Sequence, residues 1–121
     1  MILLMMLAGG LGAVARFLLD GIVRRRVPDS PGLGTGLINV TGSFVLGLFA
    51  GLIAANVVPP AWHAVVATGF FGGYTTFSTA SFETVRTAQA GRLRQAVTQA
   101  VGTAVVSLTA AGMGYGLGLW L

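Results

Sequence analysis

The residues best suited to chemistry in this sequence are polar side chains set inside long apolar runs. Asn39 and Ser43 are four residues apart, as are Thr103 and Ser107, so each pair shares one face of a helix. Their amide and hydroxyl groups supply hydrogen-bond donors without a fixed charge. Serine and threonine in membrane helices most often bond the carbonyl four residues earlier, so this spacing leaves both a polar track and simple internal bonding open.

A second polar group interrupts an apolar run in the sequence GFFGGYTTFSTASFET, residues 69–84. A backbone that leaves the helix in hydrocarbon exposes unpaired peptide groups, and each costs several kcal/mol. We expect Gly72 and Gly73 to free the backbone from helical angles, with the hydroxyls of Thr75 and Thr76 around the break. Free carbonyls coordinate cations and free amides bind anions, so the stretch favours an ion or substrate site over a simple kink.

Three further residues have side chains that could act on an ion. Arg16 lies within the first apolar run, where a charge is expensive and usually functional, although a long side chain can also snorkel to the surface. Phe77 follows the expected break, and the positive edge of a buried ring favours an anion, with ordinary packing as the alternative. The third residue is Glu83, a carboxylate near the end of the same stretch. The three acids of the chain are too scattered to predict a carboxylate pair or a metal cage.

The composition indicates a membrane protein rather than an enzyme or a soluble domain. The 121 residues are 55% hydrophobic and 8% charged, whereas soluble domains average about 25% charged residues. The chain has one histidine and no cysteine, which excludes disulfides, thiolate metal sites and cysteine nucleophiles. No catalytic constellation is present, and no cofactor motif is found beyond a faint dinucleotide-like GLGAVA that no strand precedes.

Four apolar segments are long enough to position these residues as transmembrane helices, because about 20 residues cross the hydrocarbon core. We predict a single all-α membrane domain over 1–121, with spans at about 2–23, 33–58, 61–87 and 96–121. The third span is expected to break near Gly72–Thr76. Glycines spaced four apart predict close helix approach, in the pairs Gly47/Gly51, Gly112/Gly116 and Gly114/Gly118.

The arginines predict how the spans are oriented. Six of the seven lie in the first and third links between spans, which share one side of the membrane: Arg24, Arg25, Arg26, Arg86, Arg92 and Arg94. The other side carries none, so the positive-inside rule predicts cytoplasmic first and third links and both termini outside. This bias sets topology in the cell membrane, and we expect no nucleic-acid role.

Three stretches resemble the Fluc or CrcB family of small four-span fluoride channels along nearly the whole chain. GGLGAVARF (9–17) is similar to the first-span signature with its buried arginine, and GLINVTGSFVLG (36–47) to the second-span asparagine motif. GFFGGYTTFSTASFE (69–83) resembles the third-span GGxTTFST motif, which is the most specific of the three.

The resemblance implies passive export of cytoplasmic fluoride through an antiparallel dimer, with two narrow pores and a structural sodium ion at its centre. By motif position it implies that the carbonyls of Gly72 and Thr75 bind that sodium and that Arg16 is a buried cation near the pore. It assigns the anion path to Asn39, Thr76, Phe77, Ser78, Glu83, Thr103 and Ser107.

Two departures from the family pattern shape the expected assembly. The motif usually continues TTFSTF, but here Ala80 replaces the second pore phenylalanine, and Phe82 lies about 200° round the helix from a substitute position. The arginine bias also disfavours two oppositely inserted copies of one chain. We therefore hypothesise a dimer with a related subunit of opposite bias. The alternatives are a non-conducting partner subunit, which Ala80 would suit, and a proton-coupled small multidrug transporter, which would need a buried first-span carboxylate where this chain has Arg16.

Overall fold

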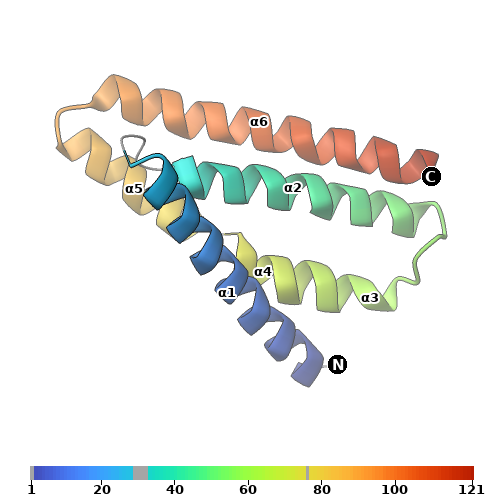
Figure 1. Ribbon diagram of the computed structural model, residues 1–121. Coiled ribbons are helices and arrows are strands. Elements are labelled where there is room, and N and C mark those ends of the chain that lie inside the picture. The colour runs from blue at the N-terminus through green and yellow to red at the C-terminus, as the bar shows by residue number, and fades with distance from the viewer. Residues whose placement is uncertain (1, 29–32, 76) are drawn as a thin grey trace.

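The computed structural model of the chain describes residues 2–28, 33–75 and 77–121, and for residues 77–79 it describes the backbone only. These residues form helices joined by short turns, which confirms the all-α prediction (Figure 1). The elements are α1 (Ile2–Arg26), α2 (Leu33–Ala54), α3 (Ala61–His63), η1 (Ala64–Phe71), α4 (Gly72–Tyr74), α5 (Phe77–Gln89) and α6 (Leu93–Trp120), where η1 is a π-helix.

Three of these helices, α1, α2 and α6, are long and apolar enough to cross a membrane by length and composition. Their outer faces carry many exposed leucine, valine and isoleucine side chains, and Ile38 is the largest fully buried side chain among the described residues. An apolar exterior of this kind matches a hydrocarbon environment. The region predicted as the third span instead forms shorter helical stretches on each side of Thr75.

Local capping explains where the helix ends differ from the predicted bounds. Asn56 adopts a left-handed conformation with φ 62°. The Asn56 N–H donates to the Ile53 carbonyl at 3.0 Å and the Val57 N–H to the Leu52 carbonyl at 2.9 Å, which is a Schellman motif. The motif ends α2 at Ala54, four residues before the predicted bound. Gly91, with φ 82°, ends α5 in the same way, so α6 begins at residue 93 rather than 96.

The break in the third segment falls inside the predicted stretch but has a different cause. Thr75 is extended, with φ −80° and ψ 153°, and Thr76 lies outside the described residues. Gly72 is helical, with φ −62° and ψ −36°, so the expectation that the glycines free the backbone is wrong. At Gly73 a Cβ would instead clash with the Gly9 carbonyl of α1. The glycine therefore allows close approach of α1 and α4.

Close helix contacts hold the remaining elements together. α2 packs along α6, α1 packs against η1 and α4, and α5 packs against α6. Between α2 and α6 the predicted glycine pairs make the contact, because a Cβ at any of these positions would clash with the backbone of the facing helix: Gly47, Gly51, Gly114 and Gly118. Gly112 and Gly116 have open space around them, so that predicted pair makes no close contact within the chain.

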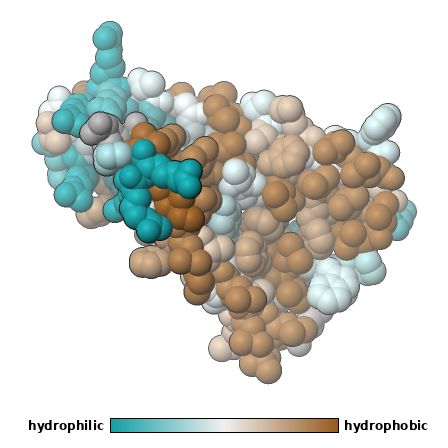
Figure 2. Space-filling model, in the orientation of Figure 1, coloured by the Kyte–Doolittle hydropathy of each residue, from teal (hydrophilic) through white to brown (hydrophobic). Residues whose placement is uncertain are grey.

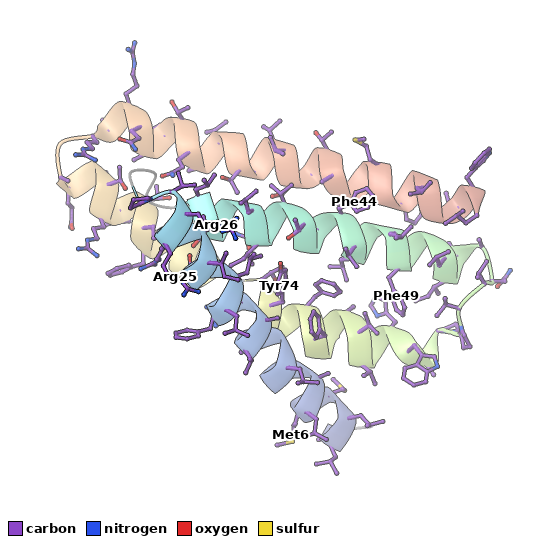
Figure 3. All side chains as sticks on the ribbon, in the orientation of Figure 1. Met6, Arg25, Arg26, Phe44, Phe49 and Tyr74 are labelled. Atoms are coloured by element: carbon purple, nitrogen blue, oxygen red, sulfur yellow. The ribbon has the colours of Figure 1, made fainter. Side chains whose placement is uncertain are left out.

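An aromatic cluster fixes the end of the third segment that precedes the break. The Phe70, Phe71 and Tyr74 rings lie 5.1–5.8 Å apart between centroids. Tyr74 lies between α4 and α2 (Figure 3), and its hydroxyl is 3.0 Å from the Thr41 hydroxyl of α2. The cluster therefore ties α4 to α2 immediately before the break.

The two ends of the molecule differ in polarity. The C-terminal end of α1, the first turn of α2 and the α5–α6 turn lie at one end, whereas both termini and the α2–α3 turn lie toward the other (Figure 1). Hydrophilic residues gather at the first of these ends, and apolar residues cover most of the visible remainder (Figure 2). The helix ends that flank the first and third links therefore lie at the same end of the molecule.

Candidate functional site

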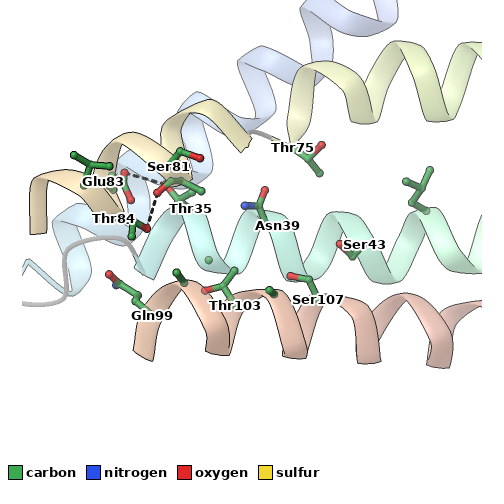
Figure 4. Close-up of a pocket in the computed structure, with 16 residues that line it drawn as sticks. Thr35, Asn39, Ser43, Thr75, Ser81, Glu83, Thr84, Gln99, Thr103 and Ser107 are labelled. Atoms are coloured by element: carbon green, nitrogen blue, oxygen red, sulfur yellow. Dashed lines mark hydrogen bonds between the residues drawn. The ribbon is translucent and has the colours of Figure 1, made fainter. Parts of the chain in front are cut away.

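A cleft with a volume of about 620 Å³, lined by both polar and apolar side chains, lies between α2, α5 and α6 (Figure 4). Its apolar lining includes Leu46, Ala80 and Val85. Its polar lining consists of Thr35, Asn39, Ser43, Thr75, Ser81, Glu83, Thr84, Gln99, Thr103 and Ser107. The cleft thus brings together six of the residues that the sequence singled out, namely Asn39, Ser43, Thr75, Glu83, Thr103 and Ser107.

Two facing stripes of polar side chains form the length of the cleft. α2 contributes Thr35, Asn39 and Ser43, and α6 contributes Gln99, Thr103 and Ser107. Each stripe has a spacing of four residues, which keeps its members on one helical face. The sequence pattern predicted the last two members of each stripe but not Thr35 and Gln99. Both lie one further step of four residues toward the N-terminus, so the same spacing identifies them.

The hydrogen bonding of the Ser107 hydroxyl distinguishes a polar track from internal back-bonding. Its hydroxyl oxygen is buried and has no hydrogen-bond partner in the described part of the chain. Thr109, on the exposed side of the same helix, instead donates to the Val105 carbonyl at 2.9 Å. Internal back-bonding, which the sequence left open for Ser107, is therefore wrong for this residue. An unpaired buried hydroxyl costs about 1–3 kcal/mol, so a ligand that accepts its hydrogen bond would recover that energy.

Glu83 gives the cleft one charged wall. Its Oε1 accepts a hydrogen bond from the Thr35 hydroxyl at 3.0 Å, and Thr35 itself is only 4% exposed. The same oxygen lies 3.7 Å from Nη2 of Arg24, on α1. The Glu83 side chain is 21% exposed. Residues 48 positions apart in sequence thus meet at this end of the cleft, which no local pattern reveals.

Arg16 contacts the break in the third segment. Its Nε donates to the Gly73 carbonyl at 3.2 Å, and the residue is half-buried between α1 and α4. The guanidinium therefore lies beside the last turn of α4 rather than at an end of α1. Thr75 closes that turn, because both its backbone N–H and its hydroxyl donate to the Phe71 carbonyl, at 2.9 and 2.7 Å.

The chemistry available for a cation at this break is that of backbone oxygens. In the residues that the structure describes, no group of three or more His, Cys, Asp or Glu side chains could hold a metal. The last carbonyls of a helix have no intrahelical partner, and Gly72–Tyr74 are the final helical residues before the break. Unwound backbone carbonyls are the ligands by which membrane proteins coordinate sodium, so the donor set fits that ion.

Three predicted residues lie outside what the structure describes, namely Thr76 and the side chains of Phe77 and Ser78.

The structure shows where Ala80, which departs from the family motif, and Phe82 lie. Ala80 lines the cleft, whereas the Phe82 side chain is on the outside, with an exposed fraction of 65%. This confirms that Phe82 does not replace the missing ring.

Sequence comparisons identify the relatives of the chain. Residues 3–115 match the family described as CrcB-like protein, Camphor Resistance (CrcB). Fluoride-specific ion channel FluC 1 of Leifsonia xyli subsp. xyli is 56% identical over 120 residues, which cover 99% of this chain and 85% of the relative. Fluoride-specific ion channel FluC 2 of Cutibacterium acnes is 44% identical over 118 residues, covering 93% and 92%. Fluoride-specific ion channel FluC 3 of Brucella suis biovar 1 is 35% identical over 122 residues, covering 98% and 92%. Because the match extends over nearly the whole chain, this protein belongs to the CrcB family.

Proposed function

We propose that this chain is a subunit of a fluoride-selective ion channel that releases cytoplasmic fluoride passively across the cell membrane. Its relatives are named as fluoride-specific ion channels, and the relative from Leifsonia xyli covers almost all of the chain. The function class is a channel rather than an enzyme. The permeant ion passes along the cleft between α2, α5 and α6.

The physical support for an anion path is the set of uncharged donors. Fluoride is small and holds its hydration water tightly, so a dry path must replace that water with hydrogen-bond donors. The amide of Asn39 and the hydroxyls of Thr103 and Ser107 can donate without trapping the ion on a fixed positive charge. The buried, unpaired hydroxyl of Ser107 is the observation that carries the proposal. Its donor becomes satisfied when an anion passes.

The assembly that we propose is an antiparallel dimer with four spans per chain, in which the segment from α3 to α5 forms the broken third span. Six arginines lie in or beside the first and third links, which the positive-inside rule assigns to the cytoplasm with both termini outside. A partner of opposite arginine bias would insert the other way round, so a related subunit fits better than a second copy. A sodium ion at the dimer centre would be held by the carbonyls of Gly72 and Thr75. It would link the third-span break of one subunit to the same break in the other.

One observation favours a second candidate, a partner subunit that completes another chain's pore without conducting itself. Ala80 lines the cleft where the family motif usually supplies a phenylalanine. A subunit of this kind should tolerate replacement of Asn39 by alanine in a co-expressed pair. A conducting subunit should lose fluoride export on the same replacement.

Growth on fluoride tests the function directly. A bacterium that lacks its own fluoride channels would express this chain, a family member of opposite arginine bias, or both. We expect the pair to restore growth in fluoride, with the Asn39 variant of this chain reducing that rescue. Absence of rescue by the pair, with both chains present in the membrane, would refute the channel function. Full rescue by this chain alone would instead refute the heterodimer.

A further inference from the structure

A carboxylate in the wall of an anion path presents an electrostatic difficulty. Glu83 lines the cleft, and its side chain is only 21% exposed, so water screens its charge incompletely. A fixed negative charge repels an approaching anion over the Debye length, which is about 10 Å at 0.1 M salt. An anion path through this end of the cleft therefore requires a group that offsets Glu83.

Arg24 is placed to be that group. Its Nη2 lies 3.7 Å from Glu83 Oε1, the oxygen that also accepts the Thr35 hydroxyl. Its Nε lies 3.1 Å from Oδ2 of Asp20, one turn earlier on α1. The guanidinium therefore lies between two carboxylates that come from different helices, although the Arg24 side chain is 68% exposed and water screens part of its charge.

Asp20 is itself placed by the first turn of α2. A Cβ at Gly34 would clash with Asp20 Oδ1, so the carboxylate lies directly against that turn. The start of a helix carries a partial positive charge of about half an elementary charge, which offsets part of the Asp20 charge. Arg24 can then compensate Glu83 even though it also pairs with Asp20.

The neighbouring Arg25 does not share this geometry. Its Nε donates to the Gly21 carbonyl of its own helix at 3.3 Å, and Arg25 is exposed, as Arg24 is. Arg25 contributes the same formal charge on the same side of the molecule as Arg24. Arg25 therefore provides a matched control. It separates compensation of the Glu83 charge by Arg24 from the general positive charge at this end of the molecule.

We propose that Arg24 is a positioning residue for conduction. It neutralises the Glu83 carboxylate, at the end of the cleft that Thr35 and Glu83 line, so that an anion can enter. Asp20 fixes the place of the guanidinium. This role rests on the proposed channel function for the identity of the permeant ion. The charge compensation itself does not require conduction, and it can be measured separately.

The first test measures the electrostatic potential in the cleft. The chain has no cysteine, so Ala100→Cys introduces a single thiol at an exposed position in the cleft wall. The rate of its reaction with an anionic methanethiosulfonate, divided by the rate with a neutral one, reports the local potential in detergent. Val85→Cys provides a second reporter in the same cleft, on α5 rather than α6.

We expect Arg24→Gln to lower this rate ratio by about two- to fivefold at low salt, the range for a partly exposed ion pair. Arg25→Gln should change the ratio much less, and Glu83→Gln should raise it. The double variant Arg24→Gln/Glu83→Gln should return to the starting ratio. Equal effects of the Arg24 and Arg25 variants, or no effect of Arg24→Gln with either reporter, would overturn the proposal.

The second test measures fluoride efflux from liposomes that contain the chain with its partner. Arg24→Gln should slow efflux by a similar factor, and Arg25→Gln should not. Equal slowing by the two variants would contradict local compensation. If the unmodified pair fails to release fluoride, the proposed function is wrong, whereas the thiol reactivities still decide the role of Arg24.

Discussion

Replacing Ser107 by alanine should slow fluoride conduction without destabilising the protein. The hydroxyl is buried and unpaired, so the folded state gains no hydrogen bond from it. Its removal should leave the free energy of unfolding unchanged or raise it by up to about 1 kcal/mol. A hydrogen bond to a charged group contributes about 1.5–3 kcal/mol, and each 1.4 kcal/mol changes a rate about tenfold. Efflux should therefore fall by roughly 10- to 100-fold.

The assay combines fluoride efflux from liposomes with thermal unfolding in detergent, both for the chain with its partner. Thr109→Val is the matched control, because that hydroxyl is exposed, bonds the Val105 carbonyl and does not line the cleft. Its efflux should stay within about twofold of the unmodified pair. Efflux through the Ser107 variant at the unmodified rate would refute the role of the hydroxyl. A large loss of its thermal stability would refute the unpaired state.

Three further predictions test the elements around the cleft. Gly73→Ala should lower the free energy of unfolding by about 1–3 kcal/mol, because the added Cβ clashes with Gly9. Gly112→Ala, in open space, should not lower it. Equal stabilities of the two variants in thermal unfolding would contradict the α1–α4 contact. Arg16→Gln should slow efflux about tenfold or more through loss of the guanidinium donor to the Gly73 carbonyl, and an unchanged rate would exclude that role. Replacing sodium by a large organic cation during purification should lower the unfolding temperature of the dimer, and indifference to sodium would argue against a structural ion.

Segments with strong local signals could be predicted from the sequence. Apolar length predicted α1, α2 and α6, and the GGYTT stretch predicted a break that the structure has at Thr75. The spacing of four residues predicted that Asn39 and Ser43 share a face, as do Thr103 and Ser107. These features depend on residues near one another in the chain, so pattern alone reveals them.

Features that depend on a distant segment could not be predicted in this way. A glycine serves equally well for unusual backbone angles and for close approach, and only the position of α1 shows that Gly73 serves the second purpose. The contacts of Glu83 with Thr35 and Arg24 join three helices, so no spacing signals them. The end of α2 was also misplaced, because asparagine rather than glycine adopts the left-handed angle at its Schellman motif.

The most direct test of the proposed pathway is the fluoride and chloride efflux, measured with ion-selective electrodes, from liposomes containing this chain and a partner of opposite arginine bias. We predict rapid fluoride efflux, chloride efflux no faster than from protein-free liposomes, and a strong reduction of the fluoride rate on replacing Ser107. Fluoride efflux at the protein-free rate, or equal release of both anions, would contradict a selective path along the cleft between α2, α5 and α6.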